Sequence, residues 1–222
     1  MATTHQSERI GAPEESRRTA RDAVHQVNAQ LVDLLCRQAA VRTTPFPLPD
    51  RLRERFVDLS DDDRLRLARC GTLLVDLGLA DPHRWKTDAD ALETSNWAIA
   101  RSNHWLLPQE AFLIAHATIL IVWSILNSNS PEASVLLGAS QETARIIATM
   151  GVKELSRIAQ RHPEWVRVRW VHVPRVWGDL LDFATALDSG RFRFVPLRCL
   201  QMLAGPPTGR AHKHLLQRAR HT

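Results

Sequence analysis

Residues 108–127 read PQEAFLIAHATILIVWSILN, and the run from Ala111 to Leu126 within them is the most apolar of the chain. This run has 16 residues and includes a histidine, a threonine and a serine, whereas a membrane-spanning helix needs about 20 consecutive apolar residues. The NSNSP sequence at 127–131 favours turns and ends a helix. We therefore predict a buried core helix from about Pro108 to Asn127 and a mainly α-helical fold around it.

A second long helix is predicted before the apolar run. From Glu14 to Ala40, apolar residues recur every three or four positions, which is typical of an amphipathic helix. Such a helix packs either on the body of the protein or against a second subunit. The TTPFPLP segment at 43–49 predicts an extended linker, because proline lacks a backbone donor and disfavours helix at the residue before it. The residues of the predicted apolar face are Ala20, Val24, Val27, Leu31 and Leu34 or Leu35.

Shorter helices are predicted along the rest of the chain. Ser60 and Asp63 match an N-terminal capping pattern, which opens a helix that runs to Cys70. The acidic triplet at 61–63 suits the positive end of the helix dipole, and cation binding is the alternative use of it. Turn-forming residues separate the remaining helices, which are expected at 132–137, 141–150, 153–161, 179–187 and 197–203.

Two extended segments are also predicted, at 72–79 and 165–173. The second alternates like a strand, with mixed faces that suit a small hairpin or an edge. Each segment follows a helix and precedes a Pro-x-x-Trp motif, so that 66–85 matches 157–177 with one inserted residue. The match is either chance or an internal duplication. A duplication predicts two similar lobes around the central helix.

The expected organisation is a helical domain with terminal extensions. At 222 residues the chain fits one large or two small domains. The expected ranges are a disordered N-terminus (1–13), an amphipathic helix with its linker (14–44), an N-terminal lobe (45–105), a helical core with a C-terminal lobe (106–206) and a basic tail (207–222).

Composition indicates a soluble protein of the cytoplasm that does not insert into a membrane. Apolar residues make up 44% of the chain, which is a globular profile. The three cysteines, Cys36, Cys70 and Cys199, are odd in number and far apart, so they predict neither a disulfide framework nor a zinc ribbon. The first 20 residues contain no apolar run and carry acids among the basic residues, unlike a secretory signal or a transit peptide.

Positive charge is concentrated in the last third of the chain. Residues 1–150 hold 16 Lys and Arg against 19 Asp and Glu, whereas residues 151–222 hold 13 against 5, a net charge of +8. A basic surface attracts phosphates at long range and releases their counterions on contact, so this asymmetry favours a polyanionic partner. The alternative is an ordinary solvated basic face.

The sequence contains no recognisable catalytic constellation, cofactor motif or metal site, and we expect a protein that is not an enzyme. The tail histidines His212, His214 and His221 lack further nearby ligands and are expected to be solvated. His116 is expected to be a core histidine with one hydrogen-bond partner. The seven tryptophans mostly have apolar neighbours, which favours core packing over base stacking.

The clearest functional signal runs from Ala133 to Ala148, ASVLLGASQETARIIA. A helix that stops at Gly138, a cap at Ser140 and a second apolar-faced helix are typical of a helix-turn-helix, although many helical hairpins share the pattern. As a recognition helix, the second helix would direct outward Gln141, Glu142 and Arg145.

Residues 112–170 resemble the FlhD family, a subunit of the flagellar master transcriptional regulator. The order of features is similar: a long apolar helix, a polar turn, a short helix ending in Leu-Gly at 137–138, a helix with apolar pairs, a helix containing LSRIA at 155–159 and a basic extended segment. The resemblance implies an all-helical, dimerising, DNA-associated regulator that acts with a second subunit. Family members are much shorter than this chain, and the resemblance leaves 1–105 and 175–222 unexplained.

We therefore expect a DNA-associated transcriptional regulator, an activator of FlhD type, that is oligomeric or acts with a partner regulatory subunit. Arginine suits phosphate because its planar guanidinium can donate two hydrogen bonds at once. The rival hypothesis is a protein-interaction adaptor of a secretion or motility system, in which the tryptophan-bearing repeats bind protein; a helical enzyme is a third. The expected DNA-binding residues are Gln141, Arg145, Arg157, Arg161, Arg167 and Arg169.

Overall fold

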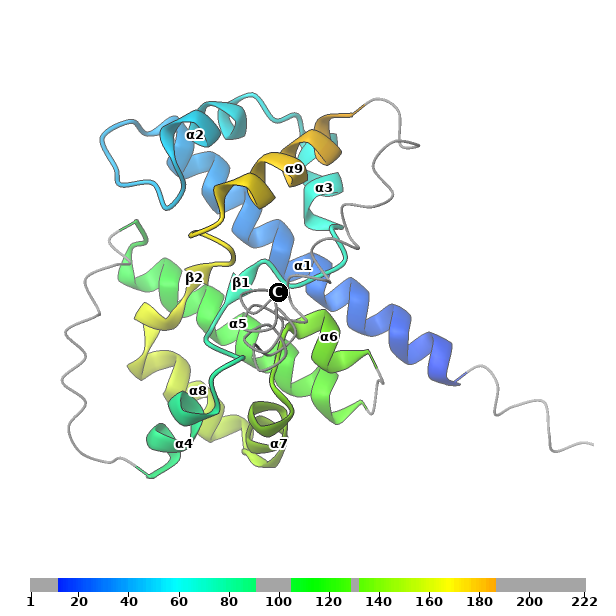
Figure 1. The fold of residues 1–222 in the computed structure, drawn as a ribbon. Helices are drawn as coiled ribbons and strands as arrows, with labels where there is room; N and C mark the ends of the chain where they lie inside the picture. Colours follow the sequence, from blue (N-terminus) through cyan, green and yellow to red (C-terminus); the bar gives the residue numbers. More distant parts are fainter. Residues whose placement is uncertain (1–11, 91–104, 129–131, 187–222) are drawn as a thin grey trace, which may run out of the picture.

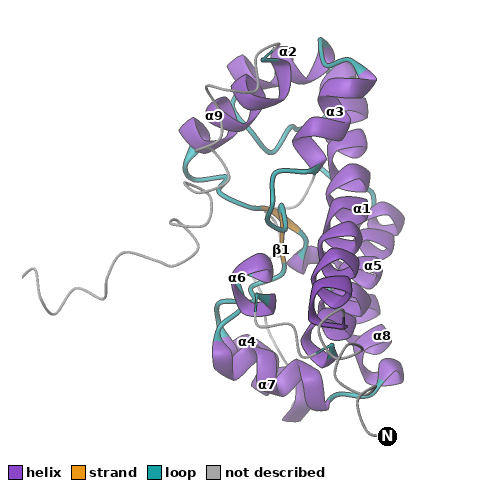
Figure 2. Ribbon diagram, turned by 90° about the vertical axis from the view of Figure 1, so that its right-hand side faces the viewer, coloured by secondary structure: helices purple, strands orange, loops and turns teal. Residues whose placement is uncertain are grey.

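The computed structural model describes residues 12–90, 105–128 and 132–186, and these residues are mainly α-helical, as predicted. Two long helices lie side by side, and shorter helices surround a two-stranded antiparallel sheet (Figure 1). Seen from the side, α1, α5 and α8 lie on one side of the sheet and α9, α6 and α4 on the other (Figure 2). The elements are α1 (Ala12–Ala40), α2 (Asp50–Val57), α3 (Asp61–Ala68), β1 (Val75–Asp76), α4 (Pro82–Asp90), α5 (Pro108–Asn127), α6 (Ala133–Leu137), α7 (Gln141–Thr149), α8 (Val152–Arg161), the 3-10 turn Pro163–Trp165, β2 (Arg167–Val168) and α9 (Pro174–Thr185).

Helix α1 contributes its predicted apolar face to the core and packs on the body of the same chain. All the residues predicted for that face are buried. The helix contacts α2, α3 and α5. At its C-terminal end, the Arg53 guanidinium donates hydrogen bonds to the carbonyl oxygens of Gln38 (3.2 Å) and Ala39 (3.2 Å), which satisfies groups that a helix end leaves without a partner.

Helix α5 has the predicted bounds and forms the core between α1, α7 and α8. Among the described residues, it is the one helix long and apolar enough to cross a membrane. Pro108 occupies the first turn, where its missing N–H costs no hydrogen bond. His116 is a partly buried histidine whose Nε2 lies 3.1 Å from Ser156 Oγ, in agreement with the sequence-based expectation.

The caps predicted for the short helices are present. Ser60 Oγ accepts a hydrogen bond from the Asp63 backbone N–H (3.2 Å), and the Asp63 carboxylate accepts one from the Ser60 N–H (3.1 Å). The hydrogen bonds from Ser60 hold the pKa of Asp63 below its usual value. Asp63 therefore caps the helix, which agrees with the first of the two roles predicted for the acidic triplet.

The two extended segments are much shorter than predicted. β1 and β2 have two residues each and pair antiparallel with one another, with Val75 opposite Val168 and Asp76 opposite Arg167. The second segment stops at Trp170, whose positive φ of 55° turns the chain out of the strand. The alternating pattern of 165–173 therefore does not correspond to a long strand, and its first five residues lie largely in the core.

Three helices differ from the sequence-based expectation. Helix α9 begins at Pro174, one turn or more before its predicted start, because proline is favoured in the first turn of a helix. Helices α2 and α4 were not predicted, and α4 begins in the same way as α9, at Pro82. Several predicted parts lie outside the described residues. They are the helix expected at 197–203, residues 1–11 of the N-terminus, the basic tail at 207–222 and the polar region at 91–104.

The structure favours duplication over chance as the origin of the repeat. Positions 91 residues apart fall in equivalent elements: α2 corresponds to α7, α3 to α8 and β1 to β2. Asp76 and Arg167 are 91 residues apart and lie opposite one another in the two-stranded sheet. A twofold relation between the copies requires such a pairing of equivalent positions. The indole Nε1 of Trp85 donates to Gly78 O and that of Trp177 to Arg169 O, two acceptors that are again 91 residues apart.

The two copies exchange their last helices. Helix α4 of the first copy packs on α7 of the second, and α9 of the second packs on α2 and α3 of the first. Trp85 lies against Trp165 of the other copy (ring centroids 5.3 Å apart), and Trp177 lies against Phe56 (5.8 Å). The regions expected as an N-terminal lobe and a C-terminal lobe therefore share one core.

Candidate nucleic-acid interface

The segment from α6 to α7 contains the glycine stop and the serine cap that were predicted from the sequence. Gly138 ends α6 in the left-handed region (φ 64°), where glycine avoids the steric cost that other residues incur. Ser140 caps α7, since its Oγ accepts a hydrogen bond from the Thr143 N–H (3.1 Å). The turn is anchored to the first copy, because Ser140 N–H donates to Leu79 O (3.0 Å).

The start of α7 is exposed, as predicted. Gln141, Glu142 and Arg145 all reach solvent. One of them is already engaged, since Lys86 on α4 forms an ion pair with Glu142 and lowers the pKa of that carboxyl chiefly through its hydrogen bond. Helix α7 contacts both α4 and α5, and Gln141 and Arg145 remain exposed.

Helix α8 has a buried apolar face and an exposed basic face. Its inner side chains, Leu155, Ile158 and Ala159, are buried against the core, with α5 as the neighbouring helix. Its outer face carries a row of exposed cations, which we call the α8 row, and no member of it forms an ion pair within the described residues. The α8 row consists of Lys153, Arg157 and Arg161.

Arg169 does not belong to a nucleic-acid interface, and the prediction that placed it there is wrong. Only 6% of its surface is exposed, and its Nη2 donates to Leu137 O (2.7 Å) at the end of α6. Burial lowers the pKa of its guanidinium, which the nearby Asp76 partly opposes. Arg169 therefore connects the C-terminal end of α6 to the two-stranded sheet. Its buried guanidinium cannot reach a phosphate from there.

Arg167 lies in β2 and is half-buried, with its Nε enclosed by protein. Arg84 lies close enough for its pKa to be lowered first by burial and then by the charge of Arg167. Arg84 lies over the Trp165 ring, 4.7 Å from the centroid. The structure thus separates the six predicted contacts into two groups. Four are exposed on helices, namely Gln141, Arg145, Arg157 and Arg161, and two lie in or next to β2, namely Arg167 and Arg169.

A buried polar cluster ties α1 to the segment before β1. Asn28 is fully buried; its Nδ2 donates to Thr72 O (2.7 Å) and Ala68 O (3.0 Å), and its Oδ1 accepts from Leu74 N–H (2.8 Å). Cys70 lies 3.8 Å from the same amide, and burial raises the pKa of its thiol to about 11. A protonated, enclosed thiol is a poor nucleophile, so this cluster is structural.

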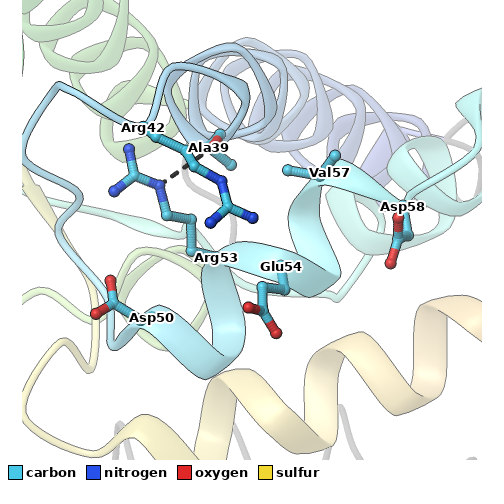
Figure 3. Close-up of a pocket in the computed structure, with 7 residues that line it drawn as sticks. All are labelled: Ala39, Arg42, Asp50, Arg53, Glu54, Val57 and Asp58. Carbon is cyan, nitrogen blue, oxygen red and sulfur yellow. Dashed lines mark hydrogen bonds between the residues drawn. The ribbon is translucent and has the colours of Figure 1, made fainter.

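A pocket of about 460 Å³ lies between the end of α1 and α2. Figure 3 shows Arg53 turned toward the end of α1 and the carboxylates of Asp50 and Glu54 directed away from it. Because Arg53 is committed to backbone carbonyls, the exposed Arg42 is the remaining cation of the lining. The lining contains no nucleophile paired with a base, and we assign it no chemistry.

Most of the positive charge of the last third of the sequence lies beyond the described residues. Residues 187–222 hold 7 Lys and Arg against 1 acid, which leaves only a small excess on residues 151–186. The tail histidines His212, His214 and His221, which were expected to be solvated, also lie beyond the described residues. Among the described residues, no group of three or more His, Cys, Asp or Glu is placed to hold a metal ion.

Comparisons with known proteins add no relative. No protein-family model, no curated protein and no solved structure matches the chain. The resemblance to the FlhD family accordingly stays a hypothesis that rests on the order of sequence features.

Among the members of the α8 row, the sequence analysis named Arg157 and Arg161 and missed Lys153. The signal for Lys153 is present in the chain, because three cations spaced by four residues oppose an apolar face in 152–161. The burial of Arg169 had no such signal, since alternation cannot tell a strand at a surface from one that crosses a core.

Proposed function

We propose that the chain is a DNA-associated transcriptional regulator that contacts duplex phosphates through the α8 row and the exposed start of α7. The observation that carries this proposal is the α8 row itself: exposed cations on one face of a helix, without acidic partners among the described residues. In this proposal the recognition element is α7, Met150-Gly151 and α8, with α5 as the supporting helix.

The spacing within the row suits a phosphate backbone. Four residues of α-helix rise about 6 Å, so successive members of the row lie one turn apart on one side of the helix. Each cation that neutralises a phosphate releases condensed counterions, which supplies affinity without reading sequence. Gln141 and Arg145 are the side chains proposed to reach base edges, since an amide or guanidinium group can form two hydrogen bonds with the edge of one base.

The proposal includes a cytoplasmic location and action with a second subunit, both of which follow from the FlhD resemblance and the composition. The adaptor hypothesis in its tryptophan-mediated form is not supported, because Trp85 and Trp177 are fully buried. Their indoles pack between the two copies and are not available to a partner.

The test is a fluorescence-anisotropy titration of mixed-sequence duplex DNA at several salt concentrations. We compare the wild type with the triple variant K153A/R157A/R161A. If the α8 row binds phosphates, the variant binds more weakly, and the slope of log K against log salt becomes shallower by about 0.9 for each phosphate that the variant no longer neutralises.

The matched control is R18A/R51A/R69A, which removes the same charge from exposed arginines elsewhere that form no ion pair within the described residues. The control should bind as the wild type does. Equal losses of affinity in both triple variants would reduce the interaction to net charge and reject α8 as the interface, and no binding at low salt would reject the function.

A further inference from the structure

The duplication gives the chain a second pair of helices equivalent to α7 and α8. Helices α2 and α3 begin 91 residues before α7 and α8, and the two pairs lie at opposite ends of the molecule (Figure 2). Five equivalent positions are exposed in both pairs, so each end presents the same helical surface to solvent. These positions are Asp50 and Gln141, Glu54 and Arg145, Asp58 and Thr149, Asp62 and Lys153, and Arg66 and Arg157.

The two ends differ in charge at the five equivalent positions. In the second copy three of them are cations and none is an acid, whereas in the first copy four are acids and one is a cation. We call these four acids the acidic set, and none of them forms an ion pair within the described residues. The acidic set consists of Asp50, Glu54, Asp58 and Asp62.

The one cation among the five positions of the first copy is already engaged. Arg66 forms an ion pair with Asp63, and its Nε donates to Ala184 O (2.6 Å) of the exchanged helix α9. The exposed cations Arg42 and Arg51 also lie at this end, and they offset two of the four charges of the acidic set. The first copy therefore presents a net negative surface where the second copy presents a positive one.

A duplex that approached the first copy would bring its phosphates against carboxylates. Like charges brought together at an interface disfavour binding, and carboxylates cannot replace the counterions of a phosphate backbone. We propose that the chain engages one DNA duplex through α7 and α8, and that the acidic set excludes a second duplex from the equivalent end. The inference rests on the proposed function, because it concerns the same ligand and the same interface.

The consequence concerns the kind of DNA site that one chain occupies. A regulator with twofold symmetry presents two equivalent recognition helices and binds two symmetric half-sites. This chain has a twofold relation between its copies, but the side chains of only one end suit phosphates. One chain therefore occupies a single half-site and does not bridge two duplexes.

Sedimentation velocity of the full chain with an excess of a short labelled duplex, of about one helical turn, measures how many duplexes one chain holds at low salt. The wild type should saturate at one duplex per chain. The variant D50Q/E54R/D58T/D62K gives the first copy the side chains of the second and should saturate at two. Addition of K153A/R157A/R161A to this variant should return the ratio to one, because the duplex that remains is held by the first copy.

The matched control is E14K/D22K/D33K, which changes the net charge by the same amount at exposed positions of α1 that form no ion pair within the described residues. The control should still hold one duplex per chain. Far-UV circular dichroism confirms that the variants are folded. If the fourfold variant does not fold, E54R/D62K provides the same test with two exposed changes.

The outcomes separate this inference from the proposed function. A wild type that holds two duplexes per chain would overturn the inference and leave the proposed function standing, whereas a wild type that holds none would reject both. A fourfold variant that still holds one duplex, or a control that gains a second, would show that the acidic set is not what excludes the second duplex.

Discussion

Two buried polar residues, Asn28 and Arg169, hold together segments that are far apart in the sequence. Asn28 satisfies three backbone groups of the segment 68–74, and Arg169 satisfies the carbonyl of Leu137 at the end of α6. Neither role can be recognised in the sequence, where Asn28 occupies one position of an otherwise apolar helical face and Arg169 one position of a basic run. Buried polar groups are retained when they are hydrogen-bonded, and these contacts exist only in the folded chain.

Asn28→Ala should lower the free energy of unfolding by about 3 kcal/mol, because it leaves two buried carbonyls and one buried N–H without their partner. Urea unfolding followed by tryptophan fluorescence measures the change. Asn127→Ala is the control: Asn127 is exposed and bonds only Trp123 O within its own helix, so the change in stability should stay within about 0.5 kcal/mol. Equal effects of the two substitutions would refute the role given to Asn28.

At the scale of the element, the helices follow from capping residues and periodicity, whereas the extended segments do not. Pro108 and Ser140 mark helix starts in the sequence and in the structure alike. Each strand has only two residues, and the chain turns at Trp170 soon after the second strand. Each strand pairs with a segment of the other copy about 90 residues away, which local sequence does not encode.

Gly78 and Gly178 should respond to alanine in opposite directions. Gly78 has a positive φ of 72°, and a Cβ there would lie 2.5 Å from Arg84 Nη1, so Gly78→Ala should destabilise the fold by about 1–2 kcal/mol. Gly178 lies inside α9 with nothing within 4 Å of an added Cβ, so Gly178→Ala should stabilise it by up to about 1 kcal/mol. Thermal unfolding of the two variants measures both changes. A decrease in stability in Gly178→Ala would show that α9 packs more closely there than described.

At the scale of the whole molecule, the chain folds as two copies of one unit that exchange their last helices. The exchange is held by specific contacts: Arg55 pairs with Asp182 (2.7 Å) and Arg66 Nε donates to Ala184 O (2.6 Å), while Lys86 of α4 pairs with Glu142 of α7 in the reciprocal pair of helices. Each copy therefore covers part of the core of the other, and neither buries its apolar residues alone.

Division of the chain after residue 97 should give two fragments that fold only together. Fragment 1–97 lacks α9, which covers α2 and α3, and fragment 98–222 lacks α4, which covers α7. Each fragment alone should show no cooperative unfolding transition, and the co-expressed pair should co-purify with the helical content of the intact chain. Circular dichroism and size-exclusion chromatography report both properties. A fragment that unfolds cooperatively by itself would contradict the exchanged arrangement.

The sequence by itself determined the helical class, the bounds of α5 to within a residue, the buried face of α1 and the two polar caps at Ser60 and Ser140. These features follow from local chemistry, since periodicity and capping act over one or two turns. It also contained the repeat, as a match that could equally have been chance.

Only the tertiary structure decided how the copies are joined and which basic residues face solvent. The antiparallel pairing of Asp76 with Arg167 shows the relation between the copies, and this contact joins residues 91 positions apart. Arg169, which follows β2, is buried in the core, whereas the α8 row is exposed. Exposure of a charged side chain depends on what packs over it, and for a residue that crosses between two lobes those neighbours come from distant parts of the chain.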